Sequence, residues 1–119
     1  MKIKLGEIFN SQQIFERLII EKLPFRTVIN LSRLIERLTK ELQIIESERI
    51  KLIKEYGIAD EDNNYKVKDE NISTFTTKLN ELFAVEIEIA DVDYFDDTEF
   101  QNITLSLPEY LQLKPFIRS

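Results

Sequence analysis

The sequence predicts an α+β fold in a single domain, residues 1–119, organised around one long helix. Apolar residues repeat at alternating spacings of three and four between residues 28 and 56, and a shorter repeat follows at 70–83. Three further segments alternate apolar with polar residues, as half-buried strands do. We therefore expect a long helix in an antiparallel helical hairpin with two shorter helices. Beside it we expect a small three-stranded antiparallel sheet with strands near 2–5, 85–90 and 102–107.

The first elements are short. Lys2-Ile3-Lys4-Leu5 predicts a strand that stops at Gly6. Ser11 is a suitable N-cap for a first helix that runs to about Lys22. Pro24 ends that helix at the preceding residue, because the residue before a proline disfavours the helical conformation.

The long helix is predicted from Phe25 to Tyr56, with Pro24 at its start and Gly57 as a left-handed C-cap. At 1.5 Å per residue it is about 45 Å long and must cover its apolar stripe with something. We call this stripe the seam. It consists of Val28, Leu31, Ile35, Leu38, Leu42, Ile45, Leu52 and Tyr56, and it is broken only by Arg49.

Arg49 is the most informative single residue of the seam. An arginine at such a position requires a carboxylate partner or solvent, and Glu46, Glu81 or a glutamate of another subunit could supply the carboxylate. We hypothesise that Arg49 fixes register or oligomeric state. The predicted interface between copies consists of Leu31, Ile35, Leu38, Leu42, Ile45, Arg49 and Leu52.

After the long helix, residues 59–64 form a polar turn and 65–67 an extended segment. Asp69 is expected to cap the next helix, Glu70 to Phe83, which folds back as the second arm of the hairpin. This helix is too short to cover more than half of the seam. The first helix or a second copy must cover the rest.

The strand over residues 85–89 has glutamates on its outward face, whereas the first strand has lysines there. Opposite charges across a strand pair contribute about 0.2–1 kcal/mol each, so we expect these two strands to pair. Residues 103–107 are the natural third strand, ended by Pro108. A short helix or turn over 109–117 then packs its apolar side chains on the core, namely Leu111, Leu113, Phe116 and Ile117.

Composition argues against catalysis. The chain has neither cysteine nor histidine, which removes thiolate sites, the usual general base near neutral pH and the commonest transition-metal ligand. Its two glycines build no phosphate-binding loop. We therefore predict a protein that is not an enzyme and holds no metal or other cofactor. No apolar run approaches the ~18 residues needed to cross a bilayer, so no membrane association is expected.

Charge is distributed unevenly. Residues 1–56 carry 11 Lys or Arg against 8 Glu, a net charge of +3, and residues 57–119 carry 5 against 14, a net charge of −9. The densest acidic cluster comprises Asp91, Asp93, Asp96, Asp97 and Glu99. It lacks the glycine and terminal glutamate of an EF-hand loop, so a solvated acidic surface is the favoured interpretation over a metal site. The basic residues early on the long helix are interrupted by glutamates, and no nucleic acid is expected as a partner.

Several segments together carry a family resemblance. These are Leu23-Pro24-Phe25-Arg26, Leu42 through Arg49, Leu52 through Gly57, the acidic turn 60–64, Leu79-Asn80-Glu81-Leu82, Val85–Ile89 and Leu113 through Ile117. They resemble a family of small uncharacterised proteins of tailed phages and prophages of Gram-positive bacteria. The family usually has a glycine in the polar turn, where this chain has Asn63-Asn64. The resemblance implies a phage origin and action in the host cytoplasm or the virion.

The expected function is therefore that of a non-enzymatic phage protein acting through protein–protein contacts. A homo-oligomeric structural or assembly component is favoured, with a phage structural protein or a host protein as a further partner. The alternative is an acidic inhibitor of a host defence or nucleic-acid enzyme that imitates the charge of DNA.

Overall fold

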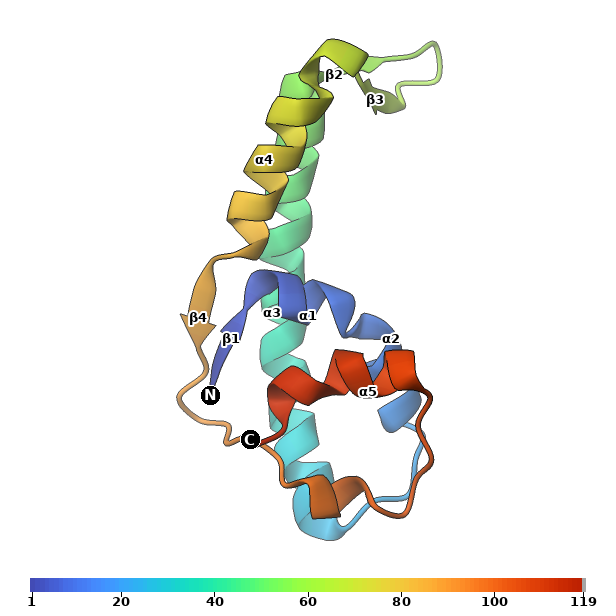
Figure 1. Ribbon diagram of the computed structural model, residues 1–119, viewed down its shortest axis with the longest axis vertical. Coiled ribbons are helices and arrows are strands. Elements are labelled where there is room, and N and C mark those ends of the chain that lie inside the picture. The colour runs from blue at the N-terminus through green and yellow to red at the C-terminus, as the bar shows by residue number, and fades with distance from the viewer. Residues whose placement is uncertain (119) are drawn as a thin grey trace.

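A computed structural model describes residues 1–118. The molecule is elongated, 49 × 27 × 23 Å, and has two parts (Figure 1). We call residues 47–83 the arm and residues 1–46 with 84–118 the body. The elements are, in order, β1 (Lys2–Lys4), α1 (Leu5–Asn10), α2 (Gln12–Leu18), α3 (Phe25–Tyr56), β2 (Gly57–Ala59), β3 (Tyr65–Val67), η1 (Asp69–Asn71), α4 (Ile72–Phe83), β4 (Glu86–Glu88), η2 (Asp97–Phe100), α5 (Leu107–Leu113) and η3 (Lys114–Phe116).

The α+β class and the long helix are confirmed, and α3 has the predicted ends. Pro24 lies just before the helix in an extended conformation, with φ −54° and ψ 148°, and its carbonyl accepts the first helical hydrogen bond from Val28. α3 runs the length of the molecule, and α4 lies antiparallel beside its distal half (Figure 1). The predicted helical hairpin is therefore present, although α4 begins at Ile72 after the short η1 turn rather than at Glu70.

The predicted pairing of the first strand with the strand near 85–89 is confirmed. β1 and β4 are antiparallel, with Lys2 opposite Glu88 and Lys4 opposite Glu86. The three-stranded sheet is wrong. Over residues 1–118 the strands form two separate two-stranded sheets, β1–β4 in the body and β2–β3 at the tip of the arm.

Residues 102–107 do not form the predicted third strand because helix-capping chemistry overrides their alternation. Ser106 begins α5 with a capping box, in which its Oγ accepts a hydrogen bond from the Glu109 N–H and the Glu109 carboxylate accepts one from the Ser106 N–H. Pro108 lies in the first turn, where a proline favours a helix. The C-terminal segment contributes a parallel bridge between Phe95 and Ile117 instead.

Two helices stand where one was predicted. α1 begins at Leu5, so Gly6 lies inside a helix and does not stop the strand. Ser11 lies between α1 and α2, and its buried hydroxyl donates to the Ile8 carbonyl instead of capping α2. Gly6 is required by close packing, since a Cβ there would lie 2.8 Å from the Phe83 Cβ.

At the tip of the arm, Gly57 is not the predicted left-handed cap. Its φ of −110° and ψ of 172° are extended, and the chain passes directly from α3 into β2. A Cβ at this position would meet the carbonyl oxygens of Ile53 and Lys66. The left-handed residue is Asn63, with φ 60°, in a turn where the Asp60 carboxylate accepts from the backbone N–H groups of Asp62 and Asn64.

The hydrophobic core lies entirely in the body. Sixteen apolar side chains are buried there, together with Ser11 and Thr27, whereas no side chain of residues 47–83 is buried. Phe15 packs edge-on against Phe116 with ring centroids 4.9 Å apart, and Phe95 packs against Phe100 at 5.3 Å. Leu113 and Phe116 pack on the core as predicted, but Leu111 is 55% exposed.

Candidate protein–protein interface

The seam is covered only in part within the chain. Leu31, Leu38 and Ile45 are buried, whereas Ile35, Leu42 and Leu52 are half-buried and Val28 is 46% exposed. A straight α-helix drifts about 20° per heptad against a seven-residue repeat. Val28, Ile35 and Leu42 therefore lie on the flank of α3, while Leu31, Leu38 and Ile45 face the core. Leu34, which the seam omits, is fully buried.

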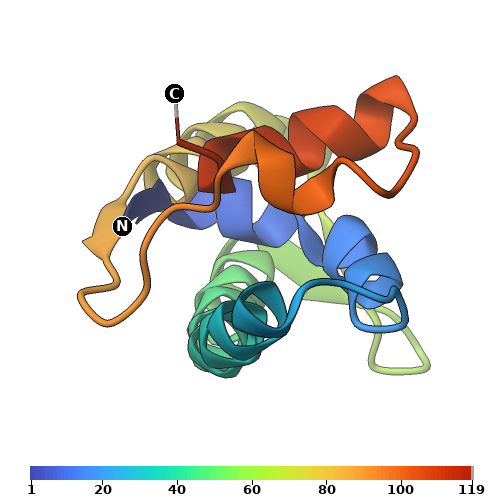
Figure 2. The same cartoon turned by 90° about the horizontal axis from the view of Figure 1, so that it is seen from below.

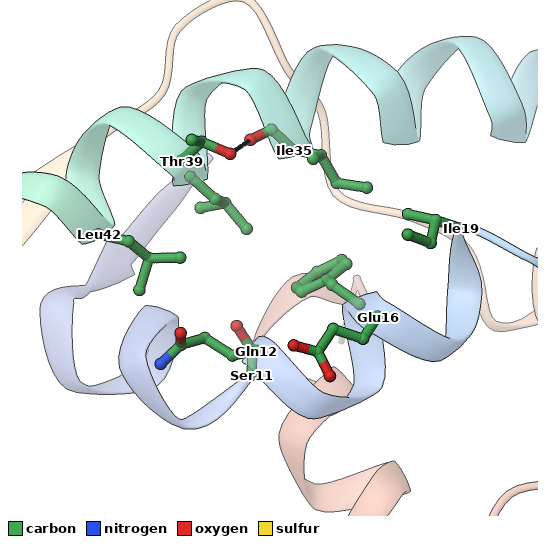
Figure 3. A pocket seen from close by; sticks show the side chains of 9 residues that line it. Ser11, Gln12, Glu16, Ile19, Ile35, Thr39 and Leu42 are labelled. Carbon is green, nitrogen blue, oxygen red and sulfur yellow. Dashed lines mark hydrogen bonds between the residues drawn. The ribbon is translucent and has the colours of Figure 1, made fainter.

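The flank of the seam opens into an apolar groove between α2 and α3. This groove has a volume of about 180 Å³. Ile35 and Leu42 point from α3 toward α2, and Gln12 and Glu16 lie on the opposite side (Figure 3). The Thr39 hydroxyl donates to the Ile35 carbonyl at 2.8 Å, so this polar rim group is satisfied within the helix.

A second hollow, of about 320 Å³, continues the groove toward the start of α3. The two hollows share Ile19 and Ile35 in their walls, and Val28 and Leu23 line the second. Together they form what we call the α2–α3 groove.

Exposed apolar side chains lie beside the end of this groove that is nearest the start of α3. In the connection between α2 and α3, Ile20 is 81% exposed, Phe25 at the start of α3 is 79% exposed, and Ile19 is 62% exposed. A concave apolar surface thus lies next to convex apolar side chains of the same chain. Neighbouring groups of this kind are what a protein–protein contact requires.

The α2 wall is fixed from behind by an ion pair to α5. Arg17 Nη1 donates to the Glu109 carboxylate at 2.6 Å, and Arg17 Nε donates to Glu21 at 3.2 Å. The hydrogen bond from Arg17 lowers the pKa of Glu109 to about 2, and the capping bonds of Ser106 contribute in the same direction. The hydrogen bond to Glu109 in turn raises the pKa of Arg17.

Arg49 has one of the partners expected for it. Its Nε and Nη2 donate to both carboxylate oxygens of Glu46, at 3.1 and 2.8 Å. These hydrogen bonds raise the pKa of Arg49 and lower that of Glu46. The guanidinium also lies 5.9 Å from the centroid of the Phe9 ring, which stacks on Phe83. Arg49 therefore lies where the arm joins the body.

The acidic cluster divides into structural and free carboxylates. Glu99 accepts from the Thr27 hydroxyl at 2.8 Å and from the Asp96 N–H at 2.7 Å, and Asp96 pairs with Arg118 at 3.1 Å. Asp91, Asp93 and Asp97 are exposed. Over residues 1–118 no group of three or more potential metal ligands is arranged to hold an ion.

Comparison with family models, curated proteins and solved structures finds no match to this chain. Within the described residues no helix is both long enough and apolar enough to span a membrane.

The sequence indicated the seam but not the groove. The first helix was predicted to reach about Lys22, whereas α2 ends at Leu18 and leaves Ile19 in the connection. Phe25 and Ile20 carried no signal of their own. The adjacent Pro24 could have indicated their exposure, since it separates the two helices and leaves a connection with few partners.

Proposed function

We propose that this chain is a non-enzymatic, phage-encoded assembly component that self-associates through the α2–α3 groove. The observation that carries the proposal is the pairing of the groove with Ile20 and Phe25, which protrude beside it. The resemblance to small phage proteins supports the setting.

A second copy is the natural occupant because one chain carries both the groove and the exposed apolar side chains that would fill it. Under a two-fold axis the contact is reciprocal: when a side chain of one copy fills the hollow of its partner, the same side chain of the partner fills the hollow of the first copy. Phe25 of one copy would enter the hollow formed by Val28, Leu23 and Ile35 of the other. Large aromatic and aliphatic side chains buried in such a pocket supply most of the binding energy of an interface.

Multi-angle light scattering after size-exclusion chromatography tests the proposal, at low and high salt. We expect a dimer that persists in high salt, because apolar contacts are not screened. Phe25→Asp and Ile19→Asp should give monomers of unchanged circular dichroism, since both side chains are already exposed. Ile58→Asp at the arm tip, 55% exposed, is the matched control and should leave the dimer intact.

A wild-type monomer at all concentrations up to about a hundred micromolar, a range that includes typical weak dimers, would contradict the proposal. Equal loss of the dimer in Ile58→Asp and Phe25→Asp would also contradict it. A monomer that instead binds a nucleic-acid enzyme in a salt-sensitive way would favour the acidic inhibitor, for which the exposed Asp91, Asp93 and Asp97 are the supporting observation.

A further inference from the structure

The two outer edges of the β1–β4 sheet differ in whether side chains bond their backbone groups. The outer edge of β1 is closed by side chains: the Lys2 N–H donates to the Tyr94 hydroxyl at 3.1 Å, and that hydroxyl donates to the Lys2 carbonyl at 2.9 Å. The Lys4 N–H donates to the Glu7 carboxylate at 2.9 Å. Capping of this kind is one way in which proteins protect a sheet edge.

The outer edge of β4 has no such cover. The Val85 carbonyl accepts from the Leu5 N–H, and the Ile89 N–H donates to the Met1 carbonyl. The backbone N–H and C=O groups of the odd-numbered residues of this segment therefore point toward β1. In an antiparallel pair the intervening residues direct their backbone groups to the other side. For Glu86 and Glu88 the structure shows no backbone partner over residues 1–118. β4 lies at the margin of the body in both views (Figures 1 and 2).

The two glutamate carboxylates of β4 are also free to pair with a partner's cations. Glu86 and Glu88 are exposed. In the described part of the chain, neither carboxylate lies within 4 Å of the ammonium nitrogen of Lys2 or Lys4. The exposed Asp91 and Asp93 follow directly and extend the negative surface. An added strand therefore meets an acidic edge.

We propose that the free edge of β4 binds an extended segment of another protein in which lysine or arginine alternates with apolar residues. The segment would add a third strand by backbone hydrogen bonds to Glu86 and Glu88. Its cations would lie on the face that carries the two glutamates, as Lys2 and Lys4 of β1 already do. This site is separate from the α2–α3 groove and does not depend on the proposed self-association.

A second copy fits this edge poorly. Two β4 strands side by side would bring glutamates opposite glutamates, which is destabilising. β3 has the required alternation of lysine with apolar residues. However, the backbone hydrogen bonds from the Lys68 N–H to the Tyr56 carbonyl and from the Asp60 N–H to the Asn64 carbonyl show that the backbone groups of its even-numbered residues point toward β2. Antiparallel addition of β3 would therefore place Tyr65 and Val67, not lysines, opposite the glutamates.

The test uses the full chain labelled with ¹⁵N and a capped peptide of alternating lysine and valine. We expect chemical-shift changes over residues 85–89 and slower hydrogen exchange of the Glu86 and Glu88 amides. A peptide with glutamate in place of lysine should bind about tenfold or more weakly, since two attractive cross-strand pairs become repulsive. High salt should weaken binding of the lysine peptide.

Two protein variants separate backbone pairing from charge. Glu88→Pro removes an outward N–H while leaving the bonds to β1, and it should abolish binding. The double variant Glu86→Gln with Glu88→Gln keeps both N–H groups, so binding should weaken without being lost. Ile19→Asp, outside this site, should bind the peptide like wild type whatever its oligomeric state.

Three results would overturn the proposal. One is no binding at about millimolar peptide, a range in which even weak recognition of short peptides is detectable. Another is binding that leaves the exchange of the Glu86 and Glu88 amides unchanged. The third is concentration-dependent protection of these amides in the protein alone, which would show that a second copy occupies the edge.

Discussion

The body and the arm share one helix but are stabilised differently. α3 buries Leu31, Leu34 and Leu38 in the body, whereas beyond residue 46 none of its apolar side chains is buried. α4 itself buries no residue. Similar three–four spacing of apolar residues thus produces a core in one region and a two-helix contact in the other. The difference depends on how many elements surround the helix, which the spacing does not encode.

An aromatic contact lies where the two regions meet. Phe9 of α1 stacks on Phe83 at the end of α4 with ring centroids 5.1 Å apart, and Gly6 allows the close approach of the two helices. The arm is therefore anchored to a rigid body at its base. Local stability is expected to fall from this junction toward the β2–β3 tip.

The largest effect should come from the body core. Phe95→Ala removes a fully buried ring that packs on Phe100 and should lower the free energy of unfolding by about 3–5 kcal/mol. Leu79→Ala, on the half-buried face of α4, should cost about 1–2 kcal/mol. Urea unfolding followed by circular dichroism measures both. Equal losses of unfolding free energy in the two variants would contradict the distinction between body and arm.

Gly6→Ala tests the junction. Alanine is the better helix former, yet its Cβ would lie 2.8 Å from the Phe83 Cβ and 3.1 Å from the Phe83 carbonyl oxygen. Overpacking at a backbone contact costs about 1–3 kcal/mol, so we expect a net loss of stability. A gain in melting temperature would show that α1 and α4 are not held at this distance.

Arg49→Leu has a smaller expected effect. It removes the forked contact with Glu46 and the contact with the Phe9 ring, together worth about 0.5–1 kcal/mol at an exposed site. Thermal unfolding combined with light scattering measures the change. A variant that kept the oligomer of the wild type and gained stability would exclude a role for Arg49 in register or oligomeric state.

The Arg17–Glu109 pair should make the stability of the fold depend on pH in acid. The pKa of Glu109 is lowered from 4.5 to about 2, so the folded state favours the carboxylate. Its stabilising contribution is complete above pH 4.5 and is lost as the pH falls toward 2. Glu109→Gln should therefore lower the melting temperature at pH 7 and flatten its dependence on pH below 4.5. Glu48→Gln, which removes an exposed pair with Lys51, is the control and should leave that dependence almost unchanged.

Local signals predicted the parts of the fold that depend on neighbouring residues in the sequence. Pro24 and the long apolar repeat located α3, and the lysine and glutamate patterns paired β1 with β4. The predicted third strand is wrong because the Ser106–Glu109 capping box, which is also present in the sequence, outweighs the alternation of residues 103–107. The opening of the groove was not predictable, since it depends on where α2 ends and on how α3 turns relative to it.

Native-state hydrogen exchange, resolved by residue, tests the contrast between body and arm most directly. We expect the amides of α1 and of α3 up to residue 46 to exchange only through global unfolding. The amides of α4 and of β2–β3 should exchange through smaller openings, fastest at the tip. Uniform protection along the whole of α3 and α4 would contradict this picture and show that the arm and the body unfold as one unit.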